Sequence, residues 1–115
     1  MALSELELKR CERDIAHFME QRRPPVHIRS ELDLGYKIER QSVEIFEIRP
    51  DWKDKSTKRK TPVAKATYVR SRDRWRIFWM RRDLKWPGYE PNYEVRLLEE
   101  FLSVVANDEY CCFFG

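Results

Sequence analysis

Apolar positions near the start of the chain recur at helical spacing. Steps of three and four residues separate the members of one apolar stripe, which are Leu8, Cys11, Ile15 and Phe18. Ser4 and Glu7 form an S-x-x-E capping box, in which each side chain satisfies a free backbone amide of the first turn. The proline pair after Arg23 cannot continue a helix. The pattern therefore predicts an amphipathic helix that is capped by Ser4 and runs to about Arg22.

The next two segments change to a period of two. In "ELDLGYKIER", residues 31–40, apolar and polar positions alternate, which predicts an antiparallel strand with one buried face. "SVEIFEIRP", residues 42–50, follows after a turn at Gln41, and its apolar positions change parity between Ile45 and Phe46. This change of parity predicts a β-bulge near Ile45 and Phe46, and the two segments are expected to form a hairpin.

A third and a fourth strand follow a long charged stretch. Residues 51–62, "DWKDKSTKRKTP", have no apolar period and are expected to form a mobile hairpin loop. "VAKATYVR", residues 63–70, and "RWRIFWMRR", residues 74–82, have strand composition and are joined by a tight turn. Trp75 and Trp79 share one parity of the fourth strand, so we expect both of them in the core.

A second helix and an apolar terminus complete the chain. Asn92 is expected to cap this helix, whose buried stripe consists of Leu98, Phe101, Leu102 and Val105. The final "EYCCFFG", residues 109–115, is apolar enough that it must pack as a short last strand or at an interface. Together the elements predict an α+β fold of one domain, residues 1–115. It is an antiparallel four- or five-stranded meander sheet with two helices packed on one face, in the order α-β-β-β-β-α-β.

Composition agrees with one folded, soluble domain. The 115 residues are 42% hydrophobic and 13% aromatic, which is enough for a core without disulfides or metals. The opening "MALSELELKR" lacks the basic and then apolar pattern of a signal peptide, and no apolar run is long enough to span a bilayer. We therefore expect a cytoplasmic protein with no membrane partner. Its three cysteines, two of them adjacent, are expected to be reduced thiols.

The modest net charge of +3 hides a strong asymmetry along the chain. Residues 49–85 contain fourteen lysines and arginines against four acids, a net of +10. The rest of the chain holds nine basic and sixteen acidic residues, a net of −7. A segment this basic favours an anionic partner.

The fourth strand suggests how such a partner would be held. If its tryptophans are buried, its other face presents arginines around Phe78. Arginines beside an exposed aromatic ring suit phosphate groups and stacked bases, so DNA or RNA is the expected partner. The candidate contacts are Lys58, Arg59, Lys60, Arg74, Arg76, Phe78 and Arg82.

Two alternatives stay open. Cross-strand ion pairs would neutralise the same face within the molecule, and the acids available for them are Glu31, Glu39, Glu44 and Glu47. Alternatively, the partner is an acidic protein or a second copy of the chain. An interaction or self-association domain of this kind would use the apolar C-terminal segment and would have no nucleic-acid role.

No residue pattern points to catalysis or to a cofactor. The two histidines, His17 and His27, are not spaced as metal ligands with the cysteines. Cys111 and Cys112 would face opposite sides of a strand, so no metal site is expected. Three glycines are too few for a glycine-rich phosphate loop. With no catalytic residue to assign, we expect a non-enzymatic binding module.

The sequence also resembles a known family. The stretch "RWRIFWMRRDLKWPGYEP", the amphipathic leading helix and the closing "FFG" are similar to a bacterial family of small proteins known only as a domain of unknown function. The residues that carry the resemblance are Trp75, Phe78, Trp86, Gly88, Tyr89 and the terminal Phe113, Phe114 and Gly115. The resemblance implies a bacterial, single-domain protein and assigns no activity, cofactor or partner.

Overall fold

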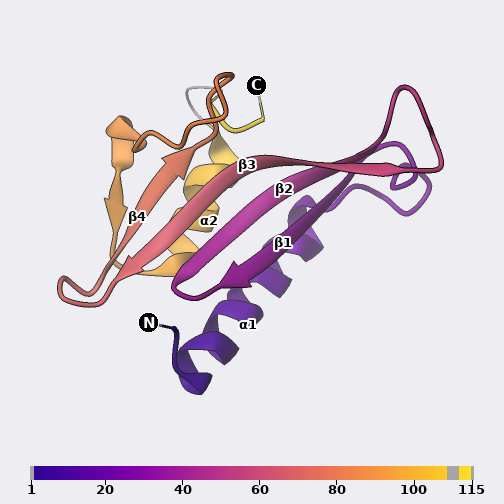
Figure 1. Ribbon diagram of the computed structural model, residues 1–115. Helices are drawn as coiled ribbons and strands as arrows, with labels where there is room; N and C mark the ends of the chain where they lie inside the picture. The colour runs from indigo at the N-terminus through magenta and orange to yellow at the C-terminus, as the bar shows by residue number, and fades with distance from the viewer. Residues whose placement is uncertain (1, 109–111, 115) are drawn as a thin grey trace.

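The computed structural model describes residues 2–108 and 112–114 and has the predicted α+β architecture. A five-stranded antiparallel sheet is packed on one face by two helices (Figure 1). The elements are α1 (Glu5–Arg22), β1 (Asp33–Glu39), β2 (Ser42–Pro50), β3 (Lys58–Val69), β4 (Arg74–Trp79), a short 3₁₀ turn η1 (Glu90–Asn92), β5 (Glu94–Val95) and α2 (Leu98–Asn107). The strands pair in chain order, β1 to β5, so the predicted meander is confirmed.

Helix α1 begins and ends as its sequence predicts. The Glu7 amide donates to Ser4 Oγ at 3.2 Å, and the Ser4 amide donates to Glu7 Oε1 at 2.9 Å, which completes the capping box. Glu7 also accepts from Arg70 Nη2 at 3.0 Å, so the first turn of α1 is tied to the end of the β3 ribbon. This guanidinium is the main reason that the pKa of Glu7 falls from 4.5 to about 2.

A bulge lies at the predicted position, between Ile45 and Phe46 in the register, and its extra residue belongs to β3. Ile45 lies opposite Ala64 and Phe46 lies opposite Pro62, which leaves Val63 as an extra residue in β3. Ile45 belongs to the core under the helices. Phe46 is buried on the other face, where it covers Gly35, and a Cβ atom at Gly35 would approach Phe46 Cε2 to 2.5 Å.

The charged loop is shorter than the expected 51–62. Strand pairing continues through the basic residues until Pro50 lies opposite Lys58, and only residues 51–57 form the turn. Backbone pairing does not require apolar side chains. This part of β3 therefore forms without an apolar period, and the sequence pattern did not predict it. The Asp51 amide closes the turn by donating to the Thr57 carbonyl at 2.8 Å.

The start of the second helix differs from the sequence prediction. Asn92 lies in η1, and α2 begins only after Leu97. Between them β5 pairs with the edge of β4, with Val95 opposite Trp75 and Glu94 opposite Arg76. Pairing with the free edge of β4 satisfies backbone groups that an earlier helix start would have left exposed.

The core lies between the sheet and the helices and includes the end of the chain. Its buried members from the helices and the fourth and fifth strands are Cys11, Ile15, Phe18, Trp75, Ile77, Val95, Leu98, Phe101, Leu102 and Val105. Trp75 is buried as predicted, whereas Trp79 is only partly buried at the edge of this core. Phe113 is 6% exposed and its ring lies 4.8 Å from that of Tyr89. Cys112 and Phe113 form a bend, Phe114 has no regular structure, and the other residues of the expected last strand lie outside the described residues.

Replacing Phe113 by Ala should destabilise the fold. The side chain fills a site against Tyr89, so its loss should lower the free energy of unfolding by about 3–5 kcal/mol. Chemical denaturation measures this, with Leu84→Ala as a control because Leu84 is exposed. A loss below about 1 kcal/mol for Phe113→Ala would show that the terminus does not belong to the core.

Replacing Glu7 by Gln should remove a stabilisation that depends on pH. The folded-state pKa of Glu7 is depressed, so its contribution is fully present above the unfolded pKa and is lost as the pH falls from about 4.5 towards about 2. The difference in unfolding free energy between the wild type and Glu7→Gln should therefore shrink over this range. Denaturant melts in one buffer series would contradict the account if the difference stayed constant.

Candidate nucleic-acid interface

The candidate contacts fall into two groups at opposite ends of β3. Lys58, Arg59 and Lys60 begin the strand, whereas Arg74 on β4 lies opposite its last residue, Val69. The twelve residues of β3 span about 36 Å at 3.3 Å per step. The two groups therefore cannot contact the same phosphate, and the structure divides the predicted site into two patches.

The arginines of β4 lie on the open face of the sheet but have an acidic neighbour. Arg76 Nε is 3.9 Å from Glu94 Oε1 on β5, and Arg72 Nε lies 2.9 Å from the same oxygen. The Glu94 carboxylate raises the pKa of Arg72. Arg74 donates to the Asp73 carbonyl at 2.9 Å. Glu94 was expected in the second helix, so sequence reasoning missed this neutralising partner.

The ring of Phe78 already contacts a cation of the protein itself. Lys65 Nζ lies 5.2 Å from the centroid of Phe78 and 4.8 Å from that of Trp86, which is a cation–π arrangement with both rings. Lys65 therefore covers ring surface on which a base would stack. Trp86 belongs to the resemblance noted in the sequence, but no signal there placed it beside Phe78.

A hollow beside Lys65 is also largely charge-balanced. It has a volume of about 350 Å³ and is lined by Lys37, Glu39, Arg40, Ser42, Glu44, Lys65 and Trp86. Lys37 Nζ lies 3.2 Å from Glu44 Oε2 and 3.8 Å from Glu39 Oε2, and Glu44 raises the pKa of Lys37. Internal pairing by Glu39 and Glu44 is thus observed, although their partner is Lys37 and not the arginines of β4.

The other patch is the end of the β2–β3 hairpin, residues 49–60, called the basic arm below. The first residue of β1, Asp33, lies opposite Ile48. Beyond Ile48, β2 pairs only with β3, and the two strands continue as a two-stranded ribbon. Figure 1 shows this ribbon extending past the rest of the sheet to its turn. The arm carries six basic residues, Arg49, Lys53, Lys55, Lys58, Arg59 and Lys60, and two acids, Asp51 and Asp54.

Both acids of the arm are engaged by its own turn. Asp54 accepts hydrogen bonds from the Ser56 amide at 3.1 Å, from Ser56 Oγ at 2.6 Å and from Thr57 Oγ1 at 3.0 Å. The Ser56 hydroxyl contributes most to lowering the pKa of Asp54. Asp51 Oδ1 accepts from the Lys53 amide at 3.0 Å. The carboxylates therefore stabilise the turn, and neither forms an ion pair with an arm cation within the described residues.

The basic side chains of the arm have few partners. Lys58 Nζ donates to the Ser30 carbonyl at 2.8 Å, and Lys60 Nζ lies 5.1 Å from the centroid of Phe46. Lys55 and Arg59 are exposed and make no side-chain hydrogen bond or ion pair within residues 2–108 and 112–114. Arg82 of the other patch is likewise exposed in the segment after β4. The arm therefore has the larger group of cations available to a partner.

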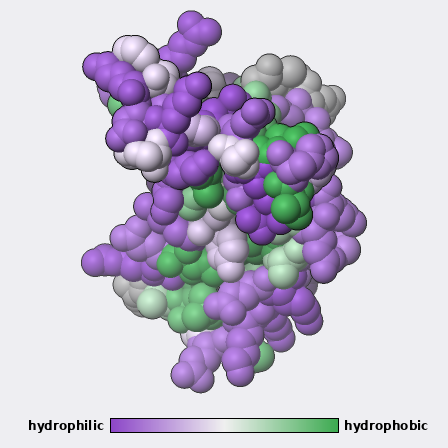
Figure 2. Space-filling view, turned by 90° about the vertical axis from the view of Figure 1, so that its right-hand side faces the viewer, coloured by the Kyte–Doolittle hydropathy of each residue, from purple (hydrophilic) through white to green (hydrophobic). Residues whose placement is uncertain are grey.

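The arm also exposes an aromatic residue that sequence reasoning missed. Trp52 in the turn is 75% exposed, and Lys53 Nζ lies 5.0 Å from its ring centroid. A single tryptophan within a run of charged residues was the available signal. Figure 2 looks onto this end of the molecule and shows mostly hydrophilic surface with small hydrophobic patches between.

Comparison with known proteins gives a family but no function. The family model described as "Domain of unknown function (DUF3024)" matches residues 3–115. No curated protein and no solved structure matches the chain.

Two features are absent from the described residues. None of their helices combines the length and the apolar content needed to cross a bilayer. They also hold no cluster of three or more His, Cys, Asp or Glu side chains placed to bind a metal ion.

Replacing Glu94 by Gln should test its role on the β4 face. Its side chain is mostly buried and pairs with Arg72, so losing the charge should lower the free energy of unfolding by about 1–2 kcal/mol. Denaturant melts measure the loss, with Glu90→Gln as the control because Glu90 is exposed. Equal stability of Glu94→Gln and the wild type would show that the β4 arginines do not depend on this carboxylate.

Proposed function

We propose that this chain, which belongs to the DUF3024 family, is a small non-enzymatic binding module whose basic arm contacts nucleic acid. One observation carries the proposal. The arm places six basic residues and an exposed tryptophan on a two-stranded ribbon. Its two acids accept hydrogen bonds from residues of the arm's own turn.

The charge of the arm supports a polyanionic partner. Its net charge is +4, and Lys55 and Arg59 are exposed and form no ion pair within the described residues. Cations of this kind displace the counterions that surround a phosphate backbone, which makes binding favourable and dependent on salt. The β4 face offers less, because Glu94 and Lys65 already contact Arg76 and Phe78 there.

The shape of the arm supports the same partner. A two-stranded antiparallel ribbon fits the major groove of duplex DNA. An exposed tryptophan also provides a surface on which an unpaired base stacks, whatever its sequence. Trp52 and Lys53 lie together at the turn, so a base and its phosphate would be contacted by neighbouring residues.

The alternative role for the C-terminal segment receives less support. Phe113 packs in the core against Tyr89, and its amide donates to Asp108 Oδ1 at 3.0 Å. These contacts give the segment a structural role within the folded chain. Self-association through this segment would require Phe113 to leave the core.

A salt titration with labelled oligonucleotides tests the proposal. Fluorescence anisotropy with duplex DNA, single-stranded DNA and single-stranded RNA should show binding that weakens steeply as salt rises. Lys55→Glu with Arg59→Glu should weaken binding at least tenfold and reduce the salt slope by about 2, one for each lost phosphate contact.

A matched control separates the arm from general electrostatics. Lys9→Glu with Arg10→Glu changes the net charge equally but lies on the exposed side of α1. It should weaken binding by less than about threefold, because charges beyond a Debye length are largely screened. No binding by the wild type at low salt, or equal losses in the two double variants, would overturn the proposal.

The β4 patch is tested in the same assay. Arg74→Gln with Arg82→Gln should leave most of the affinity intact if the arm provides the main contact. A larger loss in this variant than in the arm variant would place the interface on β4 instead.

A further inference from the structure

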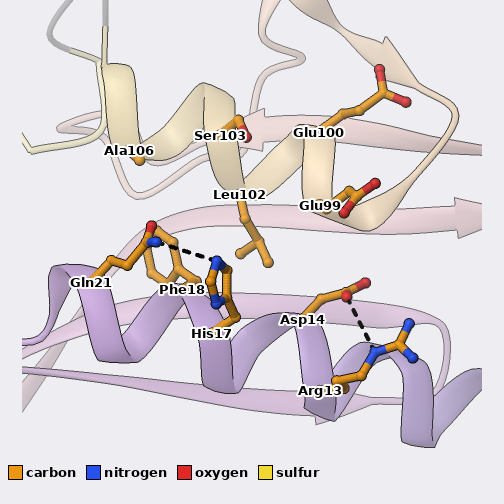
Figure 3. Close-up of a pocket in the computed structure, with 10 residues that line it drawn as sticks. All are labelled: Arg13, Asp14, His17, Phe18, Gln21, Glu99, Glu100, Leu102, Ser103 and Ala106. Atoms are coloured by element: carbon orange, nitrogen blue, oxygen red, sulfur yellow. Dashed lines mark hydrogen bonds and ion pairs between the residues drawn. The ribbon is translucent and has the colours of Figure 1, made fainter.

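A groove between the two helices is unoccupied by the chain itself. It has a volume of about 600 Å³ and lies on the helical layer, with α1 on one side and α2 on the other (Figure 3). Phe18, Leu102 and Ala106 supply its apolar surface. Figure 3 shows His17 of α1 and Leu102 of α2 projecting into the space between the helices.

The rim of this groove is acidic. Asp14, Glu99 and Glu100 line it against one guanidinium, that of Arg13, which lies 3.8 Å from Asp14. Helix α2 contributes no lysine or arginine between Leu98 and Asn107. Glu99 and Glu100 are both exposed, and Glu100 also accepts from the Leu97 amide at 3.1 Å. An occupant of complementary chemistry would be basic and would carry an apolar group for the floor.

The basic arm has this chemistry. Trp52 is exposed at its turn, and Lys53 and Lys55 follow it in the sequence. The arm is a paired continuation of β2 and β3 and projects away from the sheet, so it cannot fold back onto the helices of its own molecule (Figure 1). It is, however, positioned to reach a neighbouring molecule.

We propose that the α1–α2 groove receives the basic arm of a second copy of this chain. Trp52 of one copy lies over Leu102 and Ala106 of the other, and Lys53 and Lys55 lie near the carboxylates of the rim. The two surfaces are different, so the contact is heterologous, and a pair of joined copies keeps one free arm and one free groove. Assembly therefore continues beyond two copies, into a ring or an open chain, grows with protein concentration and weakens with salt.

The inference does not depend on nucleic-acid binding. The arm takes part in both proposals, so an oligonucleotide that occupies the arm should compete with assembly. Self-association is measured without nucleic acid, and its result is therefore independent of the salt titration described above.

Complementation between two variants tests the inference. The arm variant is Trp52→Ala with Lys55→Glu, and the groove variant is Glu99→Lys. Ser103→Arg is a second groove variant at another exposed position of the lining, in case the charge reversal disturbs α2. Circular dichroism checks that each variant is folded, and sedimentation velocity or light scattering gives the mass.

The expected result has three parts. The wild type gains mass with concentration beyond a dimer at low salt, and the association weakens at least tenfold when NaCl is raised from 50 to 500 mM. Each variant alone is monomeric. A 1:1 mixture of arm and groove variants forms a species of two chains and nothing larger, because only one intact arm and one intact groove meet.

Three outcomes would overturn the inference. The first is a wild type that stays monomeric at low salt up to millimolar concentration. The second is assembly that persists in both groove variants. The third is a mixture of folded variants that stays monomeric although the wild type assembles, since this would show that an intact arm and an intact groove do not bind each other.

Discussion

The pairing of β2 with β3 is the constraint on which the rest of the molecule depends. It runs from Ser42 opposite Thr67 to Pro50 opposite Lys58, and it holds the centre of the sheet. The bulge at Val63 lets two successive residues of β3, Val63 and Ala64, both belong to the core, while Ile45 and Phe46 of β2 face opposite sides of the sheet. The β2–β3 pairing continues beyond the last residue of β2 that pairs with β1, and this extension forms the arm. Core and arm are thus two ends of one ribbon.

The basic side chains along this ribbon differ in whether an acidic side chain pairs with them. On and beside the sheet, Lys37 forms an ion pair with Glu44, Arg72 with Glu94 and Arg70 with Glu7. These pairs are exposed on at least one side and contribute little individually to stability. Their main consequence is electrostatic, because they balance the cations of the sheet. On the arm, the two acids instead bond to the turn, and although Arg49 pairs with Glu47, Lys55 and Arg59 form no ion pair within the described residues.

Much of the fold could be predicted from the sequence because its signals are local. The Ser4–Glu7 capping box, the stripe of α1 and the change of parity at Ile45 each depend on neighbouring residues and were confirmed. The start of β3 and the strand β5 were missed because their pairing is set by a partner strand. Lys58–Lys60 have no apolar alternation, and Glu94–Val95 form a strand only because β4 has a free edge.

The candidate site was predictable in composition but not in arrangement. The sequence indicates a basic segment with aromatic residues, and the structure divides it into an arm and a largely neutralised face. Neither Glu94 beside Arg76 nor Lys65 between Phe78 and Trp86 could be inferred, because these contacts join residues from different strands or loops. Trp52 was passed over because a single aromatic residue in a charged turn has no periodic pattern to mark it.

The central claim is that the arm is the surface that meets nucleic acid, and amide and indole NMR shifts test it most directly. The four tryptophans give four indole N–H signals, of which Trp52 alone belongs to the arm. On titration with a short oligonucleotide, the account predicts that the Trp52 indole and the amides of residues 53–60 shift while the Trp75 indole stays unchanged. Shifts confined to residues 74–82, or no shifts at low salt, would contradict it.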